Sequence, residues 1–223
     1  MIKILNLLFP PKCIFCGGIL EFSCNIDVCE ACYKKLPFFN DNSKSFYSNV
    51  VGTKNFNEVI CLFEYSGIIK DSVRRYKFFN KACYYRTFAK LLSDKVKRVT
   101  MLPNFDIIMS VPLYKQREFD RGYNQAYLIS KVLSKEIHIP EYSKLLERIK
   151  NTDAQSLLAK DRRAENIKNA FRVKNPDRIK DKNILLVDDI FTTGSTIDEC
   201  CKVLKASGAK SVVAAVIASG RKY

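Results

Sequence analysis

Continuous runs of apolar residues along the chain predict buried parallel strands. Residues 184–187 read Ile-Leu-Leu-Val, residues 212–217 are all apolar, and residues 105–111 form a third, mostly apolar run that Pro112 ends. A short run without polar alternation is typical of a strand covered on both faces, as in a sheet with helices on either side. The chain is therefore predicted to be an α/β protein with a mostly parallel sheet flanked by helices.

A helical stripe lies between the last two runs. Apolar residues recur there at the spacing i, i+3, i+4, i+7 of one helix face, and the stripe ends just before Gly208. Strand, loop, helix and strand thus follow one another in the order of a βαβ unit. The residues of the stripe are Ile197, Cys200, Cys201 and Leu204.

The loop inside this unit is predicted to cradle a monophosphate. Its N–H groups lie at the start of a helix, where the helix dipole favours an anion, and its one glycine lets the backbone approach a ligand closely. The segment has neither the lysine of a Walker A loop nor the pattern G-x-G-x-x-G. The predicted phosphate-binding residues are Thr192, Thr193, Gly194, Ser195 and Thr196.

Two acids, Asp188 and Asp189, stand between the strand and this loop. Carboxylates at that point can accept hydrogen bonds from neighbouring hydroxyls of a sugar, and either can attract Mg²⁺. The alternative is an acidic turn before a helix cap rich in serine and threonine. The order of apolar strand, acid pair and hydroxyl-glycine loop favours the ligand site, so both acids are predicted catalytic and Mg²⁺-binding residues.

Cysteine spacing near the amino terminus predicts a zinc site. Five of the nine cysteines fall within the first 32 residues, and four of them form two C-x-x-C pairs separated by twelve residues. Two such turns supply the four thiolates of a closed, structural Zn²⁺ site, whereas packed, reduced cysteines are the alternative. Cys24 is either a packed neighbour or a replacement for one ligand. The predicted ligands are Cys13, Cys16, Cys29 and Cys32.

This zinc finger is predicted to form a small module of residues 1–45, similar to a double zinc ribbon, ahead of an α/β domain of residues 46–223. Residues 1–9 suit a short amphipathic helix rather than a signal peptide, and residues 41–45 form a polar link. Reduced zinc thiolates and the lack of a secretory signal favour a cytoplasmic location. No run reaches the 18 apolar residues of a membrane span, so none is predicted.

The charge of the chain points to a polyanionic partner. Lys and Arg number 38 against 23 acids, a net charge of +15, and the segment 67–99 alone carries ten cations and two acids. Aromatic residues are interleaved with these cations, which suits either stacking on single-stranded nucleic acid or a pair of helices whose rings face the core. Both interpretations remain open. The nucleic-acid candidates are Arg74, Arg75, Tyr76, Lys77, Lys81 and Arg86.

Residues 184–196 resemble the 5-phosphoribosyl 1-pyrophosphate (PRPP) signature of type I phosphoribosyltransferases. Together with the paired C-x-x-C motifs, the chain resembles the ComF family, whose ComFC-type members are associated with DNA uptake in natural competence. Other matching segments are Val111-Pro112-Leu113, Arg121 to Gln125, and the series Arg148, Gln155, Arg163 and Asn166. One departure is Ser110, where the family usually has proline.

The resemblance implies a type I phosphoribosyltransferase fold, a PRPP ligand with Mg²⁺, and phosphoribosyl transfer to an unknown acceptor. It also implies a mobile flap at residues 150–169. Cations after the strand 105–111 would stabilise a leaving pyrophosphate. The implied pyrophosphate region contains Val111, Pro112, Leu113, Lys115, Arg117 and Arg121.

Two alternatives accompany this interpretation. The chain can be a single-stranded DNA-binding competence factor in which the PRPP site is regulatory or vestigial. The zinc module can instead serve to dock a partner such as a competence helicase. The three interpretations are compatible with one another.

Overall fold

The computed structural model describes residues 10–21, 24–39, 55–78, 81–99, 104–152 and 162–220. The predicted helix at residues 1–9, the polar link at residues 41–45 and Gln155 of the predicted flap lie outside these ranges, as does the side chain of Arg163.

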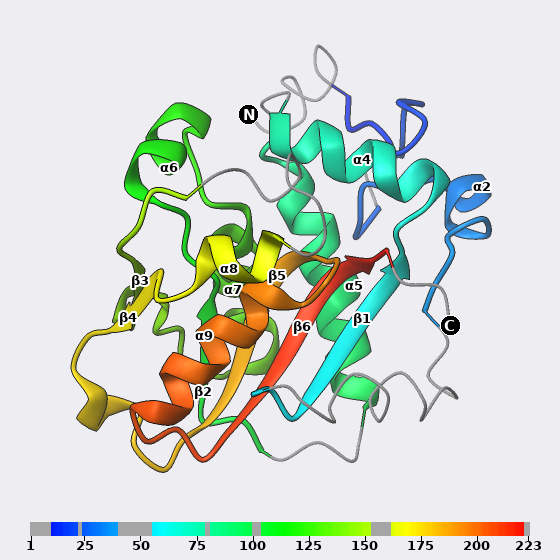
Figure 1. The fold of residues 1–223 in the computed structure, drawn as a ribbon. Coiled ribbons are helices and arrows are strands. Elements are labelled where there is room, and N and C mark those ends of the chain that lie inside the picture. Colours follow the sequence, from blue (N-terminus) through cyan, green and yellow to red (C-terminus); the bar gives the residue numbers. More distant parts are fainter. Residues whose placement is uncertain are drawn as a thin grey trace.

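A parallel sheet forms the centre of the described residues. Its four strands run in the order β1-β6-β5-β2 and pair in parallel throughout. The predicted strands are confirmed, since the three apolar runs coincide with β2, β5 and β6 (Figure 1). The bounds are β1 (Glu58–Glu64), β2 (Ile107–Ser110), β5 (Asn183–Phe191) and β6 (Ser211–Ser219).

Helices cover both faces of the sheet, as predicted. Alternate residues of β5 point to opposite sides: Leu185 and Val187 join one hydrophobic core, whereas Ile184 and Leu186 join the other. The first core is closed by α4 (Gly67–Phe78), α5 (Tyr84–Arg98) and α7 (Gln125–Ile137), and the second by α8 (Arg162–Ile167) and α9 (Ser195–Ala206) (Figure 1).

Shorter elements complete the fold. An antiparallel hairpin of β3 (Leu146–Arg148) and β4 (Phe171–Val173) lies on the α9 side of the sheet and brackets the predicted flap. The helix α6 (Lys115–Arg121) buries none of its residues and stands away from the sheet (Figure 1). The others are α2 (Glu30–Tyr33), η1 (Ser143–Leu145) and η3 (Pro176–Arg178).

The basic segment 67–99 contains two helices, α4 and α5, in which Tyr76 and Phe88 face the core whereas Tyr84 and Tyr85 are half-buried. Tyr76 and Phe88 are fully buried, with ring centroids 5.8 Å apart. Of the two interpretations of this segment, core packing therefore accounts for Tyr76 and Phe88.

Of the helices described, none has both the length and the apolar character needed to cross a bilayer.

The cysteine-rich residues 10–39 pack directly on the sheet domain. Phe38 and Phe63 form an antiparallel bridge at the edge of β1, and the N–H of Phe39 donates to the carbonyl of Leu62 at 2.9 Å. The Lys95 ammonium of α5 donates to the Phe39 carbonyl at 2.8 Å. Ile14 and other residues of this segment belong to the same hydrophobic core as α4 and α5. A division of the chain at residue 45 stays a prediction, since residues 40–54 lie outside the described ranges.

Candidate functional site

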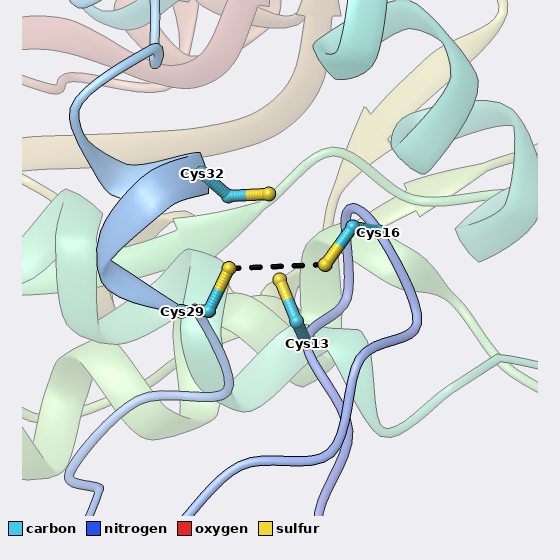
Figure 2. A group of neighbouring side chains, drawn as sticks. All are labelled: Cys13, Cys16, Cys29 and Cys32. Carbon is cyan, nitrogen blue, oxygen red and sulfur yellow. Dashed lines mark hydrogen bonds between the residues drawn. The ribbon is translucent and has the colours of Figure 1, made fainter.

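Four cysteine sulfurs converge in the amino-terminal segment. Cys13 and Cys16 lie in one loop, which turns at Gly17 with φ +77°, and Cys29 and Cys32 lie at the start of α2 and within it. All four sulfurs are within 4.8 Å of one another, and those of Cys16 and Cys29 are 3.7 Å apart (Figure 2). Zn–S bonds of about 2.3 Å in a tetrahedron place sulfurs about 3.8 Å apart. The group therefore fits a structural zinc ion.

Four thiolates this close together need a compensating positive charge. Burial opposes ionisation of Cys13, but hydrogen bonds from backbone N–H groups, including those of Cys16 and Cys29, outweigh it and lower its pKa to about 7. Burial and hydrogen bonds with the other thiols raise the pKa of Cys32 to about 12. A divalent ion supplies the charge that lets all four ionise. Cys24 is exposed and lies outside this group.

Arg75 joins the zinc loop to helix α4. Its guanidinium donates to the carbonyl of Ile14 at 2.9 Å and to that of Phe15 at 3.1 Å, both between the first two cysteines. The adjacent Arg74 is exposed. One arginine thus fixes the metal loop, whereas its neighbour faces solvent.

We expect Arg75→Ala to lower the free energy of unfolding by about 2 kcal/mol, because two charge-assisted hydrogen bonds to backbone carbonyls are lost. Arg74→Ala is the matched control and should change stability by no more than about 0.5 kcal/mol. Urea denaturation of the zinc-loaded proteins measures both. Equal stability of the two variants would contradict this role of Arg75.

The hydroxyl-rich loop turns sharply between β5 and α9. Gly194 takes φ +80° at the N-cap of α9, and a Cβ added there would lie 2.6 Å from the Phe191 ring, so the position requires glycine. The hydroxyls of Thr193 and Ser195 are 2.9 Å apart. The loop opens onto a hollow at the start of α9. Its lining residues are Asp188, Ile190, Phe191, Thr192, Gly194, Ser195, Thr196 and Ile197.

The two acids at the end of β5 lie in different surroundings. Asp188 continues the face that packs on α9, lines the hollow, and accepts a hydrogen bond from the Asp189 N–H at 2.8 Å. Asp189 is paired instead with Lys77 of α4, with 2.8 Å between Nζ and Oδ2. Burial, and then the negative charge of Asp189, raise the pKa of Asp188 to about 7. The positive charges of Lys77 and Arg148 oppose this shift without cancelling it.

The predicted pyrophosphate region begins directly beside the acid pair. The N–H of Val111 donates to the Val187 carbonyl at 2.9 Å, so the loop after β2 and the loop after β5 leave the sheet at the same edge. Pro112 and Leu113 follow, half-buried, and Lys115 is exposed on α6. Ser110 is buried, and its N–H donates to the Ser143 hydroxyl at 2.7 Å, a bond that proline cannot make.

Three arginines lie near the edge of the sheet where the loops after β2 and β5 begin. Arg117 donates to the Thr152 carbonyl and Arg148 to the Thr152 hydroxyl, so both contact the first part of the predicted flap. Arg121 donates to the Gln125 side chain at 2.6 Å; burial lowers its pKa, and the charge of Asp189 opposes that shift. Arg148 was identified only within a motif, and no signal in the sequence indicates that it reaches Thr152.

The six nucleic-acid candidates divide into two groups. Tyr76 is wrong as a base-stacking residue, because its ring is fully buried and its hydroxyl donates to the Gln125 carbonyl at 2.9 Å. Arg75 and Lys77 are bonded to the zinc loop and the acid pair. The three exposed candidates are Arg74, Lys81 and Arg86.

Comparison with known families agrees with both parts of the fold. Residues 125–223 match the phosphoribosyl transferase domain, and residues 4–43 match the double zinc ribbon domain. The match to the ribbon family and the four-sulfur geometry together support structural zinc.

Individual relatives cover much of the chain. Competence protein F of Haemophilus influenzae is 33% identical over 92% of this chain and 95% of its own. DNA utilization protein YhgH of Escherichia coli K12 is 31% identical over 70% of each chain. Competence protein ComFC of Bacillus subtilis is 32% identical over 66% of this chain and 58% of its own.

Proposed function

The chain belongs to the competence protein F family, with a double zinc ribbon and a phosphoribosyl transferase domain, and on that premise we propose that it binds PRPP at the carboxyl edge of its sheet. The observation that carries the proposal is the meeting of three features at one edge. These are the glycine turn at the start of α9, the acid pair of β5 and the loop after β2. Ligands of open α/β sheets bind outside these strand ends.

The loop after β5 supplies the site for the 5-phosphate. Backbone N–H groups at the start of α9 and the hydroxyls of Thr192, Thr193, Ser195 and Thr196 are donors suited to a phosphate dianion. Gly194 permits this turn because it tolerates positive φ and carries no Cβ that would collide with the Phe191 ring. Asp188 and Asp189, next along the strand, accept hydrogen bonds from the ribose hydroxyls.

The acid pair also suits Mg²⁺. Burial, and then the negative charge of Asp189, raise the pKa of Asp188, and oxygen ligands are those that Mg²⁺ prefers. When bound, the ion would neutralise charge on the carboxylates and on the ligand's oxygens. Asp188 and Asp189 are the residues that would hold it.

Phosphoribosyl transfer is the reaction that this arrangement favours. The bond from ribose C1 to the pyrophosphate oxygen breaks, a bond from C1 to an acceptor nucleophile forms, and pyrophosphate leaves with its electron pair. The cations of α6, Lys115, Arg117 and Arg121, follow β2, and in this proposal they stabilise the negative charge that develops on the leaving group. Chemistry of this kind depends on the leaving group more than on a protein base.

Calorimetric titration of the zinc-loaded protein with PRPP in the presence of Mg²⁺ tests the proposal. One molecule of PRPP is expected to bind per chain, and ribose 5-phosphate is expected to bind more weakly, because it lacks the pyrophosphate. Absence of PRPP binding would refute the proposed function.

Single-stranded DNA is a second candidate ligand, favoured by the exposure of three cations on α4, on α5 and between them. If Arg74, Lys81 and Arg86 contact three phosphates, the logarithm of the association constant should fall with the logarithm of salt concentration with a slope of about −2. Fluorescence anisotropy with a labelled oligothymidylate measures this slope.

Replacing these three residues together by alanine should bring the slope close to zero. The control is the triple alanine variant of Lys180, Lys205 and Lys210, which removes the same charge. These three lysines lie near the amino-terminal ends of β5 and β6. A wild-type affinity that does not change with salt would contradict DNA binding through this surface.

A further inference from the structure

Lys77 lies in the last turn of helix α4 and forms an ion pair with the acid pair of β5. Its ammonium lies 2.8 Å from the Asp189 carboxylate, and the two side chains are 20% and 14% exposed. In every other ion pair between described side chains, the cation is at least 36% exposed. Lys77 is therefore the most buried lysine or arginine in these pairs, and it is aimed at a predicted site residue.

The neighbours of Lys77 hold the helix in that position. Arg75 is bonded to the zinc loop and the hydroxyl of Tyr76 to the Gln125 carbonyl, so two consecutive residues fix the turn that carries Lys77. The Tyr123 hydroxyl donates to the Tyr76 carbonyl on the same turn. An ammonium delivered by an anchored turn loses less conformational freedom on pairing than one on a free surface side chain.

This arrangement places a fixed positive charge where a metal ion would bind. The Asp189 carboxylate has a monovalent partner within hydrogen-bond distance, whereas Asp188 faces the hollow on the other side of the strand. A divalent cation that binds the Asp189 carboxylate would have to displace the Lys77 ammonium from Oδ2 or lie beside that positive charge.

We propose that Lys77 is the resident counter-ion of Asp189, a positioning residue that a divalent cation displaces when it binds the acid pair. The proposal rests on the role given above to the acid pair, and it adds the group with which the metal competes. Lys77 keeps Asp189 at the edge of the site when no ligand is bound, and it sets how strongly metal alone is held. The protein thus favours metal that arrives with a phosphorylated ligand.

Binding of Mn²⁺ in the absence of PRPP tests the proposal. Lys77→Met keeps the length and apolar stem of the side chain but removes its charge, and it should raise the affinity of the zinc-loaded protein for Mn²⁺ at least about tenfold, because the ion no longer competes with an ammonium at contact distance. The electron paramagnetic resonance signal of free Mn²⁺ gives the bound fraction. Lys77→Gln should show the same gain if Lys77→Met is poorly folded.

Two controls isolate the contact. Arg74→Met removes the same charge from the exposed side of the same helix, and it should leave Mn²⁺ affinity within about twofold of wild type, since exposed charges are screened. Asp189→Asn added to Lys77→Met should abolish the gain. Equal Mn²⁺ affinity in wild type and in both Lys77 variants, or an equal gain in Arg74→Met, would overturn the proposal.

The PRPP titration separates this inference from the proposed function. If wild type fails to bind PRPP while Lys77→Met gains Mn²⁺ affinity, the proposed function fails and the counter-ion role stands. If wild type binds PRPP and the Lys77 variants bind Mn²⁺ as wild type does, only the counter-ion role fails.

Discussion

Removal of zinc is expected to lower the melting temperature of this protein by more than about 10 °C, because the binding energy of structural zinc is folding energy. The described part of the ribbon has one short helix, α2, and isolated β-bridges in place of a sheet, and its apolar residues complete the core beneath α4 and α5. When the metal loop opens, Arg75 loses its two carbonyl partners. The turn that carries Lys77 then loses one of its anchors.

Cys32→Ser and Cys24→Ser form a matched pair for this prediction. The first removes one of the four converging sulfurs and should reproduce the effect of a chelator, whereas the second changes an exposed thiol outside the group and should melt as wild type does. Thermal denaturation followed by circular dichroism, together with the zinc content of each protein, measures both. A zinc-free protein with the stability of the loaded one would contradict a structural metal.

Replacement of both acids of the pair by asparagine is expected to reduce PRPP affinity by at least about 100-fold. Charge-assisted hydrogen bonds contribute about 1.5 to 3 kcal/mol each, and every 1.4 kcal/mol is a factor of ten. Asparagine keeps the size of the side chains, so the loss reports on charge rather than on packing. Asp189→Asn also leaves Lys77 without its carboxylate partner, which makes the two single variants informative.

Calorimetry on the single and double variants checks this expectation. Asp177→Asn, in the exposed helix η3, is the control and should bind PRPP as wild type does. If the double variant binds PRPP with unchanged affinity, the ligand does not use the acid pair.

Most of the sheet and the metal group could be predicted because their signals are local in sequence. The apolar runs at β5 and β6, the helical stripe of α9 and the two C-x-x-C turns each lie within a short segment. Gly194 was singled out for the same reason, as the one glycine in a loop of hydroxyls between strand and helix, whereas its positive φ is seen only in the structure. Each of these features is determined by residues that lie close to one another in the sequence.

The roles of consecutive residues on α4 were not predictable in this way. Arg75, Tyr76 and Lys77 look alike as parts of a basic aromatic segment, but each helical step of about 100° turns the next side chain to another neighbour. One reaches the zinc loop, the next the start of α7, and the third a carboxylate more than a hundred residues further along the chain. Only the tertiary fold brings those partners together.

A crystal structure of the zinc-loaded protein with PRPP and Mg²⁺ tests the central claim most directly. We predict the 5-phosphate against the backbone of residues 192–196, the ribose hydroxyls at Asp188 and Asp189, and the pyrophosphate toward the loop that begins at Val111. A PRPP molecule bound instead to the exposed cations of α4 and α5, or no PRPP at saturating concentration, would contradict the account.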